Sequence, residues 1–124
     1  MASSVEQKAL QASGLELQYP PSERTAVIVV PNFPALGKLA AMRFLEWVQE
    51  NPEGVVSLPT GRTPEHFIKE VGRLTSGWRR PEVQRELEQW GLDPGRACSL
   101  SSLRFVQIDE FYPINPLHHN RFAF

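Results

Sequence analysis

Proline and glycine divide this chain of 124 residues into short segments. Eleven prolines and eight glycines occur, and both residues interrupt regular secondary structure. Three apolar runs between them predict buried strands: Ala26–Val30, Gly54–Leu58 and Leu103–Ile108. The first run is continuous, β-branched and closed by Pro31, which is typical of a strand that is buried on both faces.

Helical patterns lie between these predicted strands. Asn32 is a suitable N-cap for a helix that ends near residue 51, and apolar residues recur at every fourth position along it: Leu36, Ala40, Phe44 and Val48. A second helical pattern follows Pro64, and a third begins at Pro81 and stops at Gly91. Residues Val5–Ala12 predict a further short helix.

Strands that alternate with helices predict an α/β fold in three layers, with a mostly parallel sheet flanked by helices. We expect residues 1–25 to form an N-terminal extension and residues 26–124 to belong to the layered domain. In such sheets ligands bind beyond the carboxyl ends of the strands, because side chains and helix N-termini converge there. The loops that follow the second and third predicted strands are therefore the candidate site.

Charge and composition exclude several classes of binding partner. The formal net charge is −1 and the pI is near 6.3, which argues against nucleic acid as a partner. No apolar run approaches the roughly 20 residues that span a bilayer, so we expect no membrane contact and a soluble, cytoplasmic chain. Cys98 is the single cysteine, and His118 and His119 have no metal-ligand spacing around them. We expect no metal site.

The loop Leu58–Pro64 is the first candidate site. Gly61 lets the backbone approach a ligand closely, and Thr63 can cap the following helix, in which Pro64 needs no N–H. Free amides, the helix dipole, the threonine hydroxyls and Arg62 together favour an anion such as phosphate. The alternative is an ordinary helix cap beside a solvated arginine.

The second candidate is the pair of carboxylates that follows the third predicted strand. Asp109 and Glu110 are adjacent, so one can face a cleft while the other points away. Partial burial against Phe111 or Tyr112 would raise the pKa of such a carboxyl group towards the range of a general base. The alternative is that Asp109 caps a turn and Glu110 pairs with a surface arginine.

The two loops, in this order and about forty residues apart, resemble the glucosamine-6-phosphate deaminase and 6-phosphogluconolactonase superfamily. In the deaminases the first motif reads Leu-Pro-Thr-Gly-x-Thr-Pro and contacts the sugar phosphate, and the second reads Met-Asp-Glu-Tyr. The resemblance implies a Rossmann-like fold of the sugar-phosphate isomerase type. It also implies that the phosphate lies on Thr60, Gly61, Arg62 and Thr63, and that Asp109 moves the proton between C1 and C2.

The resemblance further implies an activity. Glucosamine 6-phosphate would be converted to fructose 6-phosphate and ammonia without a cofactor, with a small-molecule sugar phosphate as partner and a homo-oligomer as a possible assembly. Hydrolysis of 6-phosphogluconolactone and non-catalytic sugar-phosphate binding are the alternatives. Family members are about twice as long, and the Asp-Gly-His loop of their second half has no counterpart here. We therefore expect a truncated domain, inactive by itself.

Overall fold

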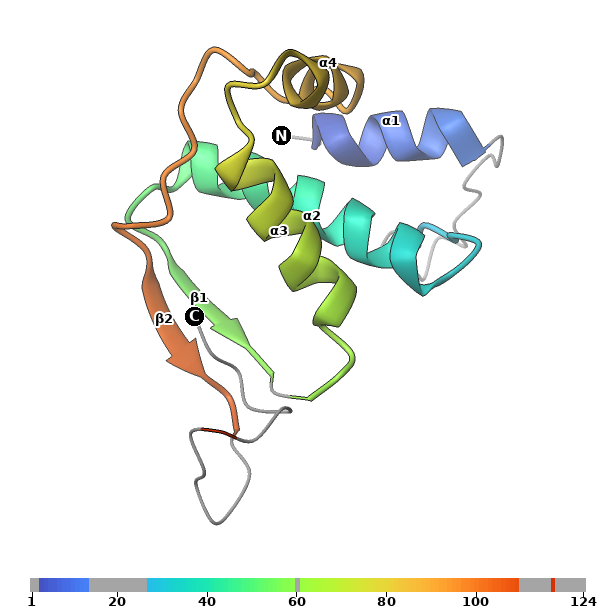
Figure 1. The fold of residues 1–124 in the computed structure, drawn as a ribbon. Helices are drawn as coiled ribbons and strands as arrows, with labels where there is room; N and C mark the ends of the chain where they lie inside the picture. Colours follow the sequence, from blue (N-terminus) through green and yellow to red (C-terminus); the bar gives the residue numbers. More distant parts are fainter. Residues whose placement is uncertain (1–2, 14–26, 60, 110–116, 118–124) are drawn as a thin grey trace, which may run out of the picture.

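Four helices and two strands make up the structure, a computed structural model that describes residues 3–13, 27–59, 61–109 and 117 (Figure 1). In chain order they are α1 (Ser4–Ser13), α2 (Phe33–Glu50), β1 (Val55–Leu58), α3 (Glu65–Ser76), α4 (Pro81–Gln89) and β2 (Arg104–Gln107). Helices account for 52% of the structure. All of them lie to one side of the two strands in Figure 1.

The predicted three-layer, Rossmann-like sheet is wrong. β1 and β2 run parallel, with Val55 opposite Arg104 and Leu58 opposite Gln107, and among the described residues they form a sheet of two strands. The described part of the first predicted strand, residues 27–30, is not a strand. Ile28 and Val30 instead pack against the core that the helices form, so the apolar run buries its side chains without joining a sheet.

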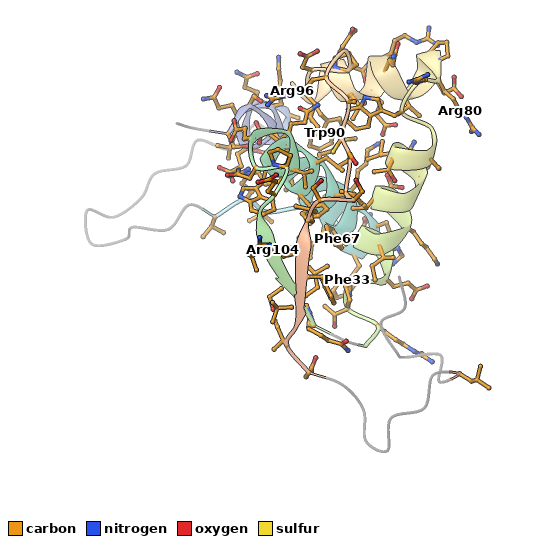
Figure 2. The ribbon with its side chains drawn as sticks, turned by 90° about the vertical axis from the view of Figure 1, so that its left-hand side faces the viewer. Phe33, Phe67, Arg80, Trp90, Arg96 and Arg104 are labelled. Carbon is orange, nitrogen blue, oxygen red and sulfur yellow. The ribbon has the colours of Figure 1, made fainter. Side chains whose placement is uncertain are left out.

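The core lies among the helices. Its most deeply buried side chains come from four different helices: Val5, Met42, Leu45, Val48, Leu74 and Leu87. At the surface of this layer Glu86 of α4 forms ion pairs with Lys38 of α2 at 2.6 Å and with Arg73 of α3 at 2.9 Å. Figure 2 shows the side chains crowded among the helices and sparse along the strands.

The apolar stripe predicted for α2 is only partly right. Val48 is buried, but Leu36 is 46% exposed, Ala40 is exposed and Phe44 is half-buried. The side chains that α2 buries lie on its other faces and include Leu39, Met42 and Leu45. Ala40 and Phe44 instead line a groove beside β1, where the two-stranded sheet covers them incompletely.

The local signals predicted at the start of α2 and at both ends of α4 are confirmed. The Asn32 side chain accepts a hydrogen bond from the Ala35 N–H at 2.9 Å and caps α2, which has proline in its first turn. α4 begins at Pro81 as predicted, and Gly91 follows it with φ +83°, in the left-handed region that favours glycine. The short N-terminal helix forms as α1.

α1 packs against the core through Val5, which is fully buried. The carboxylate of Glu46 on α2 accepts hydrogen bonds from the Ser4 N–H at 2.7 Å and from the Ser4 hydroxyl at 2.6 Å, and it also bonds the Ser3 hydroxyl. Glu46 therefore caps α1 from a neighbouring helix. The boundary predicted after residue 25 remains a prediction. No helix in the described ranges is long and apolar enough to cross a membrane.

Candidate functional site

The parallel register brings the two candidate loops to the same edge of the sheet. The Ile108 N–H donates to the Leu58 carbonyl oxygen at 3.3 Å, directly beyond the paired residues Leu58 and Gln107. The chain then leaves β1 into the loop around Gly61 and leaves β2 at Asp109. This edge lies at the lower end of both arrows in Figure 1.

The loop after β1 turns sharply at Gly61, whose φ is +93°. This is a left-handed conformation that side chains disfavour. A Cβ atom at Gly61 would meet no described atom within 4 Å, so the space beside this backbone is open. Arg62 and Thr63 are exposed, and the Arg62 carbonyl oxygen accepts a hydrogen bond from the Glu65 N–H at 3.0 Å. Thr60 lies outside the described residues.

The predicted cap of the following helix is wrong. The N-cap of α3 is Pro64 rather than Thr63, and no side chain within the described ranges caps it. Pro64 is buried, and proline at this position has no hydroxyl or carboxylate to offer to the free amides of the first turn. At the start of α3 the Glu65 N–H bonds the Arg62 carbonyl oxygen, and the described residues offer the first turn no side-chain cap.

Charges of both signs surround the start of α3. The Lys69 ammonium donates a hydrogen bond to Glu65 at 2.6 Å and lowers the pKa of this exposed carboxyl group, and the charges of His66 and Arg62 lower it further. Arg62 and His66 thus lie close enough to Glu65 to influence its ionisation. An anion that binds at this edge would compete with Glu65 for Arg62 and Lys69.

Gly37 of α2 shapes the same region, and the sequence reasoning missed it. A Cβ atom at Gly37 would lie 2.5 Å from the Cβ of His66 and 2.8 Å from the backbone nitrogen of Phe67. α2 therefore presses directly on the first turn of α3, so a ligand must approach from the loop side. The sequence feature that could have indicated this contact is a glycine inside an otherwise helical pattern, because glycine lowers helix stability there.

Asp109 lies two residues beyond the end of β2 and is exposed. The carboxylate of Glu110 and the rings of Phe111 and Tyr112, against which we expected a carboxyl group to be buried, lie outside the described residues. His118 and His119 also lie outside them. Asp109 therefore shares an edge with the Gly61 loop, and its role as a base remains a prediction.

The other sequence candidates offer little chemistry in the described ranges. Burial raises the pKa of the Cys98 thiol to about 11, so this thiol is a poor nucleophile. Within the described part of the chain, no three His, Cys, Asp or Glu residues are grouped so that they could hold a metal ion.

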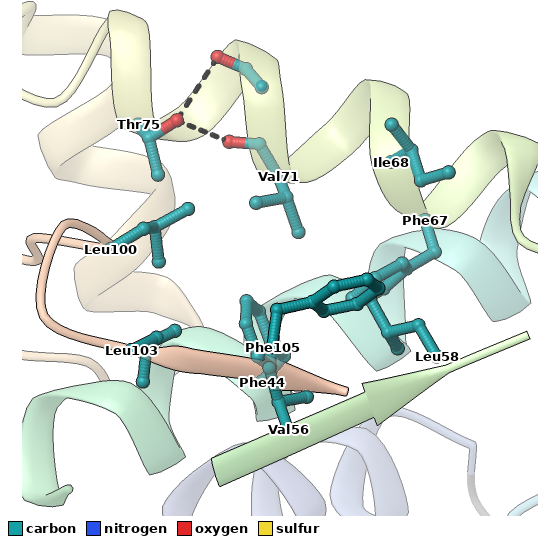
Figure 3. Close-up of a pocket in the computed structure, with 11 residues that line it drawn as sticks. Phe44, Val56, Leu58, Phe67, Ile68, Val71, Thr75, Leu100, Leu103 and Phe105 are labelled. Atoms are coloured by element: carbon teal, nitrogen blue, oxygen red, sulfur yellow. Dashed lines mark hydrogen bonds between the residues drawn. The ribbon is translucent and has the colours of Figure 1, made fainter. Parts of the chain in front are cut away.

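A cavity of about 520 Å³ lies between the sheet, α2 and α3 (Figure 3). Phe44, Phe67 and Phe105 contribute to its walls. The rings of Phe44 and Phe67 meet edge to face, with their centroids 5.4 Å apart. The sequence analysis placed Phe44 in an apolar stripe and Phe105 in a predicted buried strand, but it missed the cavity, because a periodic pattern identifies apolar faces and does not show how completely they are covered.

Comparison with known proteins finds a similarity to one subunit of the type 2 DNA topoisomerase 6 of Pyrobaculum aerophilum. The two sequences are 42% identical over 55 residues, which is 43% of this chain and 10% of that protein. The chain thus matches a small part of a much longer protein. No family model matches the chain, and no solved structure matches it.

These findings correct the resemblance to the glucosamine-6-phosphate deaminase and 6-phosphogluconolactonase superfamily. The similarity found is to a topoisomerase subunit, and the two-stranded structure is not that of a sugar-phosphate isomerase. The expected amino-sugar and lactone chemistry, and the place in carbohydrate metabolism, are therefore wrong. Two short motifs of common loop residues are weak evidence for a family, because glycine, threonine and proline recur wherever a strand turns into a helix.

The expected partners are corrected as well. We predicted a sugar phosphate and excluded nucleic acid, but the similar protein belongs to a DNA topoisomerase. The exclusion rested on net charge, which averages over the whole chain. The net charge does not show how cations are grouped on the surface.

Proposed function

We propose that the edge at which β1 and β2 end binds a phosphate group. The observation that carries this proposal is the parallel register, in which Leu58 pairs with Gln107. This pairing makes the Gly61 loop and Asp109 neighbours at one edge. In parallel sheets, such edges are where ligands collect.

The chemistry of the loop favours an anion. Gly61 in the left-handed conformation has open space beside its backbone, so an anion can approach the main-chain amides. Arg62 is exposed beside it, and its guanidinium can donate two parallel hydrogen bonds to phosphate oxygens. The exposed Thr63 hydroxyl adds a further donor, and the start of α3 has a partial positive charge.

Asp109 adds an acceptor at the same edge. A carboxylate repels phosphate. Asp109 therefore favours a ligand that carries a hydroxyl or an amine next to its phosphate group, because it can accept a hydrogen bond from that donor. In this proposal Arg62 and Thr63 hold the phosphate and Asp109 accepts from the neighbouring donor. Thr60, the remaining predicted phosphate ligand, belongs to the same loop.

Two sources of phosphate fit this chemistry. One is a small phosphorylated molecule, and the other is the backbone of nucleic acid, which is consistent with the similarity to part of a DNA topoisomerase. Phosphate contacts position a protein on DNA without reading its sequence. The experiment therefore needs one arm for each source.

Calorimetric titration of the chain with inorganic phosphate, and separately with a short DNA duplex, tests the proposal. Replacing Arg62 with alanine should weaken phosphate binding by about 1 to 3 kcal/mol, the range for losing a charge-assisted hydrogen bond. Arg79→Ala is the matched control, because Arg79 is an exposed arginine beyond the opposite end of α3.

The two arms have distinct outcomes. Phosphate binding that depends on Arg62 but not on Arg79 supports a site for small phosphorylated molecules. Duplex binding that depends on Arg62 and weakens steeply with salt supports the nucleic-acid backbone as the source. The proposal fails if neither titrant binds, or if Arg62→Ala and Arg79→Ala have equal effects.

A further inference from the structure

The cavity between the sheet and α3 is distinct from the phosphate edge, although Leu58 at the end of β1 contributes to both. β1 and β2 supply one wall, α3 supplies the facing wall, and Phe44 of α2 closes one side (Figure 3). Its volume of about 520 Å³ falls within the range of pockets that bind small molecules. The residues that line it are Phe44, Val56, Leu58, Phe67, Ile68, Val71, Gly72, Thr75, Leu100, Leu103 and Phe105.

Thr75 is the polar side chain among these described lining residues, and it is already hydrogen-bonded. The Thr75 hydroxyl bonds the carbonyl oxygen of Val71 at 2.8 Å and lies 3.4 Å from that of Gly72. Figure 3 shows both bonds running back into α3 rather than across the cavity. No charged side chain of the described ranges lines the cavity, so a charged ligand would lose its hydration without compensation.

Gly72 indicates how a ligand can enter. It lies inside α3, where glycine lowers helix stability relative to alanine. A Cβ atom there would meet no described atom within 4 Å, so the packing of the described residues does not require glycine. Gly72 is also exposed while it lines the cavity, which connects the cavity to solvent at this point.

We propose that this cavity binds an uncharged, largely hydrocarbon small molecule that enters beside Gly72. The aromatic rings of Phe44, Phe67 and Phe105 offer it apolar surface. Water is a poor occupant, because it needs polar partners that this lining does not supply. A small molecule fits better than a helix or strand of another protein, because elements on three sides already enclose the space.

The uncharged fluorescent probe N-phenyl-1-naphthylamine tests the proposal. We expect saturable binding of one probe per chain. Gly72→Leu projects a side chain into open space beside the cavity and should weaken binding about tenfold or more, while raising the melting temperature. Ser76→Leu is the matched control, because Ser76 is an exposed residue of the same helix that does not line the cavity, and it should bind as the original chain does.

A second variant that fills the cavity keeps the test valid if Gly72→Leu does not fold. Thr75→Leu adds bulk to the cavity near Gly72 and should also weaken binding, and circular dichroism checks that each variant keeps its helices. The proposal fails if no saturable binding occurs, or if one probe binds per two chains, which would indicate a cavity shared between copies. It also fails if folded Gly72→Leu and Thr75→Leu both bind as tightly as Ser76→Leu.

Discussion

Many apolar side chains are buried in the helices of this molecule, whereas several on its sheet are exposed. Met42, Leu45 and Leu74 in the helices are completely buried, whereas Val55 of β1 is 59% exposed and Ile108, directly after β2, is 65% exposed. Apolar burial supplies most of the free energy of folding. The helices therefore stabilise the structure, and the sheet depends on them.

This difference bears on function. Sites that bind ligands are commonly drawn from the less stable parts of a protein, because they need open surface. Here both proposed sites involve the sheet: the phosphate edge lies where its strands end, and the apolar cavity lies under its inner face. The densely packed helices provide the support on which these sites depend.

The largest expected effect comes from a cavity made in the helical core. Leu45→Ala should lower the free energy of unfolding by about 2 to 5 kcal/mol, because the packed helices cannot collapse into the vacated space. Val55→Ala on the outer face of the sheet should cost less than about 1 kcal/mol, since most of that side chain is already in water. Urea denaturation followed by circular dichroism measures both values. Equal losses would show that the sheet belongs to the same core as the helices.

A smaller effect distinguishes two glycines in helices. Gly37→Ala forces a Cβ atom against the backbone of Phe67 and should cost about 1 to 3 kcal/mol, the usual range for overpacking. Gly72→Ala has open space around the new methyl group and should stabilise α3 by up to about 1 kcal/mol. Thermal denaturation of the two variants shows whether each substitution lowers or raises the stability of the fold. A stabilising Gly37→Ala would contradict the close contact between α2 and α3.

Local sequence signals predicted the helices well, because their causes lie within a few residues. The side chain of Asn32 caps the helix that follows it, and Gly91 ends α4 with the positive φ that glycine tolerates. The strands at 55–58 and 104–107 were also predicted, within a residue or two at each end. At the site, the same logic brought the Gly61 loop and Asp109 to one edge, and the parallel register bears this out.

Long-range packing was less predictable. The run at 27–30 has the composition of a strand, but helices rather than strands bury half of its side chains. Only tertiary structure decides which partner an apolar segment takes. For the same reason the pattern on α2 did not reveal that Leu45 would be buried while Leu36 stayed exposed. The contact at Gly37 joins two helices, so no periodicity within α2 shows it.

The smallest expected effect concerns the attachment of α1 to the helical layer through Glu46. Burial by itself would raise the pKa of this carboxyl group, but hydrogen bonds from Ser3, Ser4 and the Val5 N–H outweigh burial and hold the pKa below its usual value. A carboxyl group with a lowered pKa in the folded state stabilises that state above its unfolded pKa. This contribution disappears as the pH falls through the folded pKa.

We therefore expect the free energy of unfolding to decline as the pH falls below about 4.5, and to decline less steeply in Glu46→Gln. At neutral pH, Glu46→Gln should cost about 1 kcal/mol, because an amide oxygen replaces a charged acceptor but still receives part of the same hydrogen bonding. Glu53→Gln, at an exposed position after α2, should change stability by less than about 0.5 kcal/mol.

Hydrogen exchange of the α1 amides between about pH 3 and 7 shows whether the loss of stability is located in α1. If α1 exchanges equally fast in Glu46→Gln and the original chain at every pH, the carboxylate does not hold α1 to the helices, and the buried Val5 contact alone must do so.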